Sequence, residues 1–270
     1  MADGIVAQGV ALSYGRNRIV EDLDLHIPPG RFTAILGANG CGKSTILRAL
    51  AGLHRPDAGA ILLDGADMGT LGARARARRI GLLAQSGAVP EGLTVEELAR
   101  QGRYPHRSLL GGWSAADAAA VEAALQATAT TALRARPLER LSGGQRQRAW
   151  VAMTLAQESD ILLLDEPTTY LDLAHQADLL GLLRRLVEPG GRTVVAVLHD
   201  LIQAARHADH IVLLVGGRIL AQGPPSRVLT PDALRAAFGI EVTILEDPET
   251  GGPLCLAHPP AAAGLASGGG

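Results

Sequence analysis

The sequence predicts an α/β fold with a mixed, mainly parallel sheet, an N-terminal antiparallel β subdomain and a helical insert subdomain. Continuous apolar runs at 161–164 and 194–198 are typical of parallel strands that are covered on both faces. Strand-like segments dominate the chain up to residue 36, and residues 90–157 are helical by composition and spacing. We therefore expect one domain over residues 3–258, with the helical subdomain at about 90–157.

The first part of the chain alternates between strands and turns. VEDLDLHI at 20–27 alternates like a half-buried strand, PPG at 28–30 predicts a turn, and FTAIL at 32–36 predicts a buried strand. A helix is expected from Lys43 to about Leu53. The turn RPDAG at 55–59 then leads to strands at AILLDG, residues 60–65, and GLLAQ, residues 81–85.

Strand–helix alternation returns after the helical insert. ILLLD and TVVAVLHD predict strands, and each is followed by a helix, at 172–187 and 201–208. HIVLLVGGRILAQG at 210–223 predicts a hairpin that turns at Gly216 and Gly217, and Thr230 before Pro231 marks a helix start. The end of the chain, 259–270, is expected to be a disordered tail.

Composition argues against several classes of protein. Apolar residues make up 47% of the 270 residues but aromatic residues only 3%, so the core is expected to be aliphatic. The 25 Lys and Arg residues nearly balance 27 Asp and Glu, so no basic field favours a nucleic acid partner. MADGIVAQGV lacks the pattern of a signal peptide, and no apolar run approaches the ~20 residues that span a bilayer. Two cysteines, Cys41 and Cys255, suit a reducing cytosol.

GANGCGKST at 37–45 fits the phosphate-binding motif G-x-x-x-x-G-K-[ST], with an apolar strand before it and a helix after it. The motif predicts a P-loop NTPase core with ATP and Mg²⁺ as cofactors. Lys43 would reach the β- and γ-phosphates, Ser44 would ligate Mg²⁺, and Thr45 would add a phosphate contact. The other residues expected to bind the nucleotide here are Gly37, Asn39, Gly40, Cys41 and Gly42.

ILLLDEP at 161–167 supplies the acidic part of such a site. An apolar strand carries Asp165 to its carboxyl edge, where Mg²⁺ is expected, and Glu166 follows directly. A carboxylate in that place can orient or deprotonate the attacking water. An acidic turn that merely ends a strand is the alternative, and the phosphate loop favours the catalytic interpretation.

LSGGQRQRAW at 141–150 opens a helix with a serine and two glycines, which leaves backbone N–H groups free for an anion. Together with the two motifs above, it resembles the signature sequence of ATP-binding-cassette (ABC) ATPases. The resemblance runs from Tyr14 to about Gln222, with the motifs in the family's order. It implies a head-to-tail homodimer in which the signature of one chain closes over the γ-phosphate of ATP held by the other. The signature residues are Ser142, Gly143, Gly144 and Gln145.

Four more positions follow from the resemblance alone. Tyr14, in ALSYGRNRIV, matches the aromatic residue that stacks on adenine. Gln85 matches the glutamine that contacts Mg²⁺ and the water and senses the transporter. Asp172, in TTYLD, matches the loop that crosses the dimer interface, and His199 matches the histidine that contacts the γ-phosphate.

Two short segments narrow the resemblance. PTTYLDLAHQ at 167–176 and QGRYPH at 101–106 are similar to the ATPase subunits of bacterial importers for iron-siderophores, haem and vitamin B12. This implies a homodimer on the cytoplasmic side of the membrane, bound to two permease subunits and served by a separate substrate-binding protein. A permease helix is expected in the groove near Gln85 and Gly102–His106. An iron(III)-siderophore is the expected load, and haem and cobalamin are the alternatives.

Other functions leave parts of the sequence unexplained. ABC ATPases of translation carry two cassettes, and those of DNA repair carry long coiled coils, neither of which is seen here. A small-molecule kinase would leave LSGGQ, Gln85 and His199 without a purpose. ARARARR at 73–79 is expected to be a solvated helix face, and His207 with His210 is not expected to bind metal. Cys41 is either a reactive thiol in the phosphate loop or a small packed hydrophobe.

Overall fold

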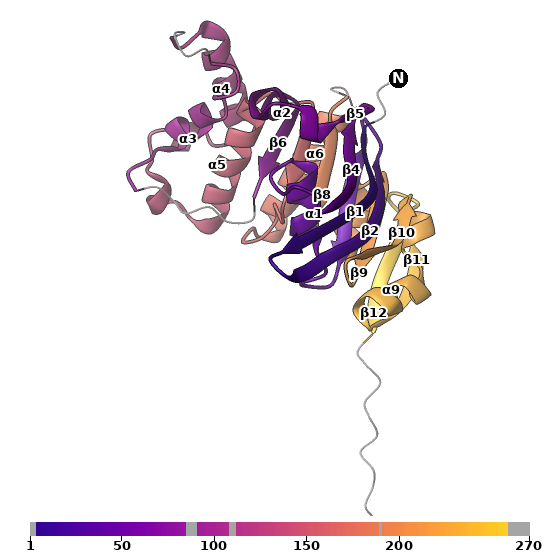
Figure 1. Ribbon diagram of the computed structural model, residues 1–270. Coiled ribbons are helices and arrows are strands. Elements are labelled where there is room, and N and C mark those ends of the chain that lie inside the picture. Colours follow the sequence, from indigo (N-terminus) through magenta and orange to yellow (C-terminus); the bar gives the residue numbers. More distant parts are fainter. Residues whose placement is uncertain (1–3, 85–90, 108–111, 189–190, 259–270) are drawn as a thin grey trace, which may run out of the picture.

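The computed structural model describes residues 4–84, 91–107, 112–188 and 191–258 (Figure 1). The expectations for Gln85 and for the tail at 259–270 lie outside these residues. No helix in the described ranges is both long enough and apolar enough to cross a membrane.

A six-stranded central sheet forms the middle of the described chain, in the order β10–β9–β3–β8–β7–β6. Five of its strands are parallel neighbours, and β10 pairs antiparallel with β9 at one edge. The strands are β3 (Phe32–Gly37), β6 (Ile80–Leu83), β7 (Ile161–Leu164), β8 (Thr193–Val197), β9 (His210–Val215) and β10 (Arg218–Gly223). The mixed, mainly parallel sheet that the apolar runs predict is therefore confirmed.

The N-terminal part forms a separate antiparallel sheet of four described strands, in the order β2–β1–β4–β5. The strands are β1 (Ile5–Tyr14), β2 (Asn17–Ile27), β4 (Ala58–Leu63) and β5 (Ala66–Asp67). Helix α1 (Lys43–Leu50) shares one hydrophobic cluster with this sheet and the central sheet. Because buried side chains from both sheets meet on α1, the start of this helix is held in a fixed place.

Helix α1 ends earlier than the sequence suggested. It stops at Leu50, whereas the expectation was about Leu53. Gly52 adopts a left-handed conformation with φ of 68°, and the Leu53 N–H then donates back to the Arg48 carbonyl at 2.9 Å. This is a helix-ending turn, for which glycine carries the smallest steric cost.

Three helices gather at one end of the molecule, away from the C-terminal strands (Figure 1). They are α3 (Val95–Gln101), α4 (Ala115–Ala127) and α5 (Gly143–Ala156), and their buried faces join one hydrophobic cluster with the central sheet. Shorter elements around them are α2 (Ala73–Arg79), η1 (Met68–Thr70), η2 (Thr131–Leu133) and η3 (Leu138–Arg140). The predicted run of helices is thus present between the strands β6 and β7.

The C-terminal part adds helices and a small hairpin. The expected turn at Gly216 and Gly217 joins β9 to β10, and Thr230 caps the helix that starts at Pro231, as expected. The elements are α6 (Leu173–Val187), α7 (Leu201–His207), α8 (Pro225–Val228), α9 (Pro231–Phe238), β11 (Glu241–Glu246) and β12 (Pro253–His258). The β11–β12 hairpin was not predicted from the sequence.

Candidate active site

The phosphate loop joins the end of β3 to the start of α1. Gly37 allows the close turn, because a Cβ atom on it would lie 2.5 Å from the Leu214 carbonyl oxygen. Gly42 has a φ of 101° just before the helix, which strains any other residue. Only 6% of Lys43 is exposed, and its Nζ donates to the carbonyls of Gly37 at 2.8 Å and Ala38 at 2.9 Å. The charge is therefore kept inside the loop, next to where phosphates would lie.

Ser44 and Asp165 connect the phosphate loop to β7. The Ser44 hydroxyl donates to the Asp165 carboxylate at 2.9 Å, although the two residues are far apart in sequence. Asp165 is only 2% exposed, and burial raises the pKa of its carboxyl, against the hydrogen bond from Ser44. These two oxygen donors suit Mg²⁺, which prefers one or two protein oxygens and completes its shell with phosphates and water.

Glu166 is held by two neighbouring side chains. Its Oε1 lies 2.8 Å from Nε2 of His199, which follows β8, and its Oε2 accepts from the Thr169 hydroxyl at 3.3 Å. Its backbone is left-handed, with φ of 51°. A non-glycine residue in this conformation is costly and is often found at functional sites.

One cavity of about 670 Å³ brings these groups together. Its lining includes the predicted residues Asn39, Gly40, Gly42, Lys43, Ser44, Thr45, Glu166 and His199. Thr169, which sequence reasoning did not select, also lines it. The signal for Thr169 was its spacing of three residues from Glu166 in DEPTTY.

Two residues of the predicted set lie differently. Cys41 is 8% exposed and packs in the hydrophobic cluster, with its Sγ near Gly37, so the structure favours the packed-hydrophobe interpretation. Tyr14 ends β1 and is not among the cavity's lining residues. Its ring is 46% exposed and meets the ring of His54 edge to face, with the centroids 4.7 Å apart.

The second anion cradle forms at the start of α5. Ser142 is the N-cap, and its hydroxyl accepts from the Gln145 N–H at 3.2 Å while the Gln145 side chain accepts from the Ser142 N–H at 3.2 Å. This reciprocal capping box fixes the helix start. Gly143 and Gly144 leave its first turn uncovered by side chains of their own.

The second cradle opens into a different cavity, of about 330 Å³. Its lining residues are Ser142, Gly143, Gly144, Gln145, Arg148, Tyr170, Asp172 and His175. None of them lines the cavity at the phosphate loop. Asp172 caps α6 by accepting from the His175 N–H at 2.9 Å, and this hydrogen bond lowers the pKa of its carboxyl. Arg148 and Tyr170 were not selected from the sequence.

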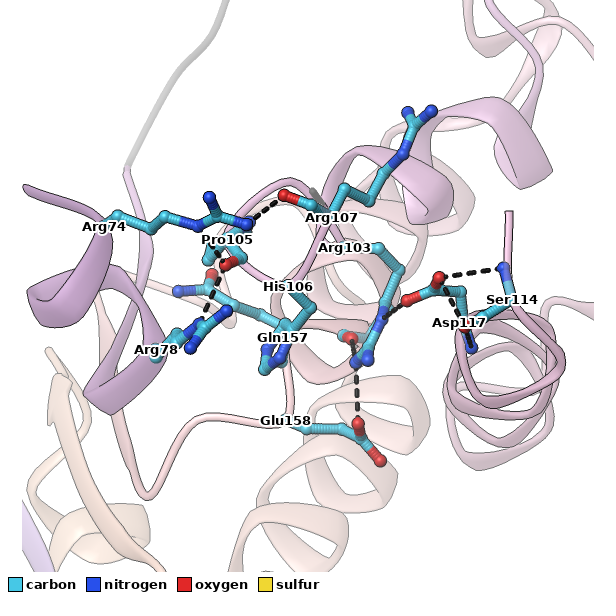
Figure 2. Close-up of polar contacts among 11 residues, drawn as sticks. Arg74, Arg78, Arg103, Pro105, His106, Arg107, Ser114, Asp117, Gln157 and Glu158 are labelled. Atoms are coloured by element: carbon cyan, nitrogen blue, oxygen red, sulfur yellow. Dashed lines mark hydrogen bonds and ion pairs between the residues drawn. The ribbon is translucent and has the colours of Figure 1, made fainter. Parts of the chain in front are cut away.

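The arginine-rich helix α2 differs from a simple solvated face. None of its residues is buried, as expected, but Arg74 and Arg78 each donate through Nε to the Pro105 carbonyl at 2.9 Å (Figure 2). Arg79 forms ion pairs with Asp64 at 2.6 Å and Asp160 at 2.8 Å. The helix therefore binds the 105–107 segment, which follows α3.

Neither histidine pair nor acidic cluster offers an additional metal site. Within the described ranges, no group of three or more His, Cys, Asp or Glu side chains is arranged to hold a metal ion. Burial lowers the pKa of both His207 and His210. This agrees with the structural interpretation of these two histidines.

The amino-acid sequence also matches known proteins. The family model for the ABC transporter matches residues 20–169. The ferric enterobactin transport ATP-binding protein FepC of Escherichia coli (strain K12) is 49% identical over 92% of this chain and 91% of its own length. The petrobactin import ATP-binding protein FpuD of Bacillus anthracis is 48% identical over 96% and 94%. The cobalamin import ATP-binding protein BtuD of Halobacterium salinarum (strain R1) is 41% identical over 90% and 61%.

Solved structures agree with the sequence matches. A metal-chelate-type ABC transporter in an inward-facing conformation superposes with a TM-score of 0.82 at 29% identity, over 95% of this chain and 98% of the other. The dimeric ABC transporter cassette MJ0796 superposes with a TM-score of 0.74 at 28% identity, over 82% and 98%. The phosphate-loop and signature cavities, the family match and these relatives together show that the chain belongs to the ABC transporter family, as an ATP-binding subunit.

Proposed function

We propose that this chain is the ATPase of a bacterial importer for iron(III)-siderophores and that a homodimer hydrolyses ATP at two shared sites. The importer class is supported by relatives whose names describe enterobactin and petrobactin transport, each nearly half identical over nearly the whole chain. The alternatives are haem and cobalamin, and a cobalamin import protein is a more distant relative at 41% identity.

The observation that carries the shared site is the separation of the two cradles. The phosphate-loop cavity contains Lys43, Ser44 and Glu166 but no signature residue, and the signature cavity contains Ser142 but no phosphate-loop residue. A nucleotide in the first cavity is therefore left open on one side. The signature of a second copy supplies the missing wall, with the Ser142 hydroxyl and the first N–H groups of α5 as donors to the γ-phosphate.

Each residue at the first cavity has a defined task in this proposal. Lys43 exchanges the carbonyls of its own loop for the β- and γ-phosphates. Ser44 and Asp165 hold Mg²⁺, which neutralises charge on the phosphate oxygens. Glu166 accepts a proton from the attacking water, and His199 and Thr169 keep its carboxylate in place. Tyr14 stacks on adenine, and Asp172 lies at the dimer interface.

The proposed partners are two permease subunits in the membrane, with a binding protein that delivers the solute. The segment Gly102–His106 after α3, together with Gln85, is the proposed place for a permease helix. The ATPase would then lie at the cytoplasmic face of the membrane as a peripheral subunit. Binding there couples movement of the helices α3–α5 to the nucleotide site.

Co-purification tests the partner and a transport assay tests the load. The tagged full-length chain is purified from detergent-solubilised membranes of its source cell, and co-purifying proteins are identified by mass spectrometry. We expect a multi-span permease. Cells that lack the chain are then given radiolabelled ferric siderophore, haem or cobalamin, and loss of siderophore uptake alone is the expected result. Loss of cobalamin or haem uptake instead would refute the siderophore assignment.

A further inference from the structure

The segment Tyr104–Arg107 and the helix α2 together form an exposed surface rich in positive charge. Tyr104 is 72% exposed, and Arg74, Arg78 and Arg107 are exposed around it. We call these four residues the Tyr104 surface. Figure 2 shows Arg74 and Arg78 converging on Pro105 while the Arg107 side chain extends away from the cluster.

Its three arginines have no acidic partner among the described residues. Arg74 and Arg78 donate only to backbone carbonyls, those of Pro105 and, for Arg74, also Arg107. A carbonyl satisfies a donor but does not neutralise a charge. Nearby arginines are paired differently: Arg79 binds two aspartates, and Arg103 binds Asp117 and Glu158. The missing negative charge is therefore specific to the Tyr104 surface.

The position of Arg74 costs stability for no internal gain in charge pairing. It lies in the first turn of α2, whose N-cap is Gly72. The positive end of the helix dipole disfavours a cation there. Arg78 and Arg74 also share one acceptor, which brings two like charges close together. Such an arrangement is relieved when an anion from another molecule approaches.

The arginines are held ready for a carboxylate. Arg78 uses only its Nε in the bond to Pro105, so both of its terminal nitrogens have donors left, and the guanidinium of Arg107 has no hydrogen bond in the described chain. A guanidinium with two free donors on one edge binds a carboxylate in a bidentate manner. Tyr and Arg are also the residues that contribute most often to binding energy in protein interfaces.

We propose that the Tyr104 surface binds an acidic cytoplasmic segment of the permease, with carboxylates on Arg78 and Arg107 and an apolar side chain against Tyr104. The inference rests on the proposed function, because the segment follows directly from the Gly102–His106 docking region. A protein partner is favoured over anionic lipid because Arg74 and Arg78 are fixed by hydrogen bonds, whereas binding to lipid headgroups needs no fixed geometry. The overall charge of −2 also gives no general attraction to a membrane.

Charge reversal at Arg107 tests the proposal on the full chain with the permease that co-purifies with it. Arg107→Glu leaves the carbonyl that Arg74 binds and touches none of the nucleotide-site residues. Arg227→Glu is the matched control, because Arg227 is exposed on α8 and forms no ion pair in the described chain. We expect Arg107→Glu to weaken permease binding by about tenfold or more, and Arg227→Glu and the wild type to bind equally. Basal ATPase activity of both isolated variants is expected to match the wild type.

Salt and charge exchange give two further readouts. Wild-type binding is expected to weaken from about 0.1 M to about 1 M NaCl, where the Debye length falls from about 10 Å to about 3 Å. Changing the acidic permease residue that contacts Arg107 to lysine should restore binding to Arg107→Glu. Equal permease binding by Arg107→Glu and wild type overturns the inference. Binding of the wild type to phosphatidylglycerol vesicles that Arg107→Glu loses, with permease binding unchanged, assigns the surface to lipid instead. Absence of any permease with the wild type overturns the proposed function itself.

Discussion

His199 Nε2 lies 2.8 Å from Oε1 of Glu166, at the carboxyl ends of two neighbouring parallel strands. The Thr169 hydroxyl contacts the other carboxylate oxygen. Both oxygens of Glu166 are thus positioned by side chains from β8 and from the turn after β7. A carboxylate that is fixed in this way at the phosphate-loop cavity is well placed to orient a water and accept its proton.

Replacing Glu166 with glutamine should keep ATP binding and nearly abolish hydrolysis. The amide keeps the shape of the side chain but cannot accept a proton from water, and general bases contribute about 10²–10⁴-fold in rate. Steady-state phosphate release measures the loss, and gel filtration with MgATP should reveal a dimer that accumulates. Glu246→Gln, on the exposed face of β11, is the control and should retain full activity. Near-normal turnover by Glu166→Gln would show that another group is the base.

Lys43 is the only lysine in the sequence, which allows a selective chemical test. Acetylation with sulfo-N-hydroxysuccinimide acetate can modify only this side chain and the N-terminal amine. Because bound nucleotide fills the cavity around Lys43, MgATP should slow its acetylation severalfold without changing that at the N-terminus. Peptide mass spectrometry reads both sites in one sample, so the N-terminus is an internal control. Equal modification of Lys43 with and without MgATP would contradict its contact with phosphate.

Both cysteines should resist thiol reagents in the folded protein. Cys41 packs against the loop backbone, and Cys255 is buried, with a pKa that burial raises, so neither thiol is presented to a reagent. Maleimide is expected to leave ATPase activity unchanged over the time in which it labels both thiols fully in urea. Rapid inactivation of the wild type but not of Cys41→Ser would instead support a reactive thiol in the phosphate loop.

The buried ion pair between Arg103 and Asp117 should stabilise the helical region in a pH-dependent way (Figure 2). Hydrogen bonds from Ser114 and then Arg103 lower the pKa of Asp117 to about 2. A depressed pKa stabilises the fold above the ordinary value near 3.8, and this contribution is lost as pH falls from about 4 towards 2. Asp117→Asn should therefore reduce the free energy of unfolding at pH 7 by about 1–3 kcal/mol.

Urea unfolding at several pH values checks this prediction. The difference between wild type and Asp117→Asn should be constant from pH 7 to about pH 5 and should shrink below about pH 4. Asp232→Asn, at an exposed surface pair with Arg235, is the control and should change little. A difference between Asp117→Asn and wild type that is the same at pH 3 and pH 7 would rule out the ionised carboxylate as its source.

Local sequence patterns predicted the elements that have a strong local signal. Apolar runs gave β7 and β8, the glycine-rich motif gave the loop before α1, and the Gly216–Gly217 turn gave the β9–β10 hairpin. The β11–β12 hairpin was missed because its strands are largely exposed and carry weak alternation. The early end of α1 was missed because Gly52 acts through a turn that the hydrophobic periodicity does not reveal.

Contacts between distant segments were less predictable. The motifs placed Ser44 and Asp165 at one site, but only the folded chain shows their 2.9 Å hydrogen bond. The inward orientation of Cys41 depends on packing between two sheets, and the bonds from Arg74 and Arg78 to Pro105 depend on the path of the chain after α3. A string of alternating arginines looks the same whether it faces water or holds a neighbouring segment.

The shared site is tested most directly by mixing two inactive variants, Ser142→Arg and Lys43→Ala. In a mixed dimer, the Ser142→Arg chain supplies an intact phosphate loop and the Lys43→Ala chain supplies an intact signature, so one of the two sites is complete. The account predicts that each variant alone is inactive, that Ser142→Arg alone still binds ATP, and that an equal mixture recovers up to about a quarter of wild-type activity from random pairing. A mixture that stays as inactive as its parts, or loss of ATP binding by Ser142→Arg alone, would contradict a site built from two chains.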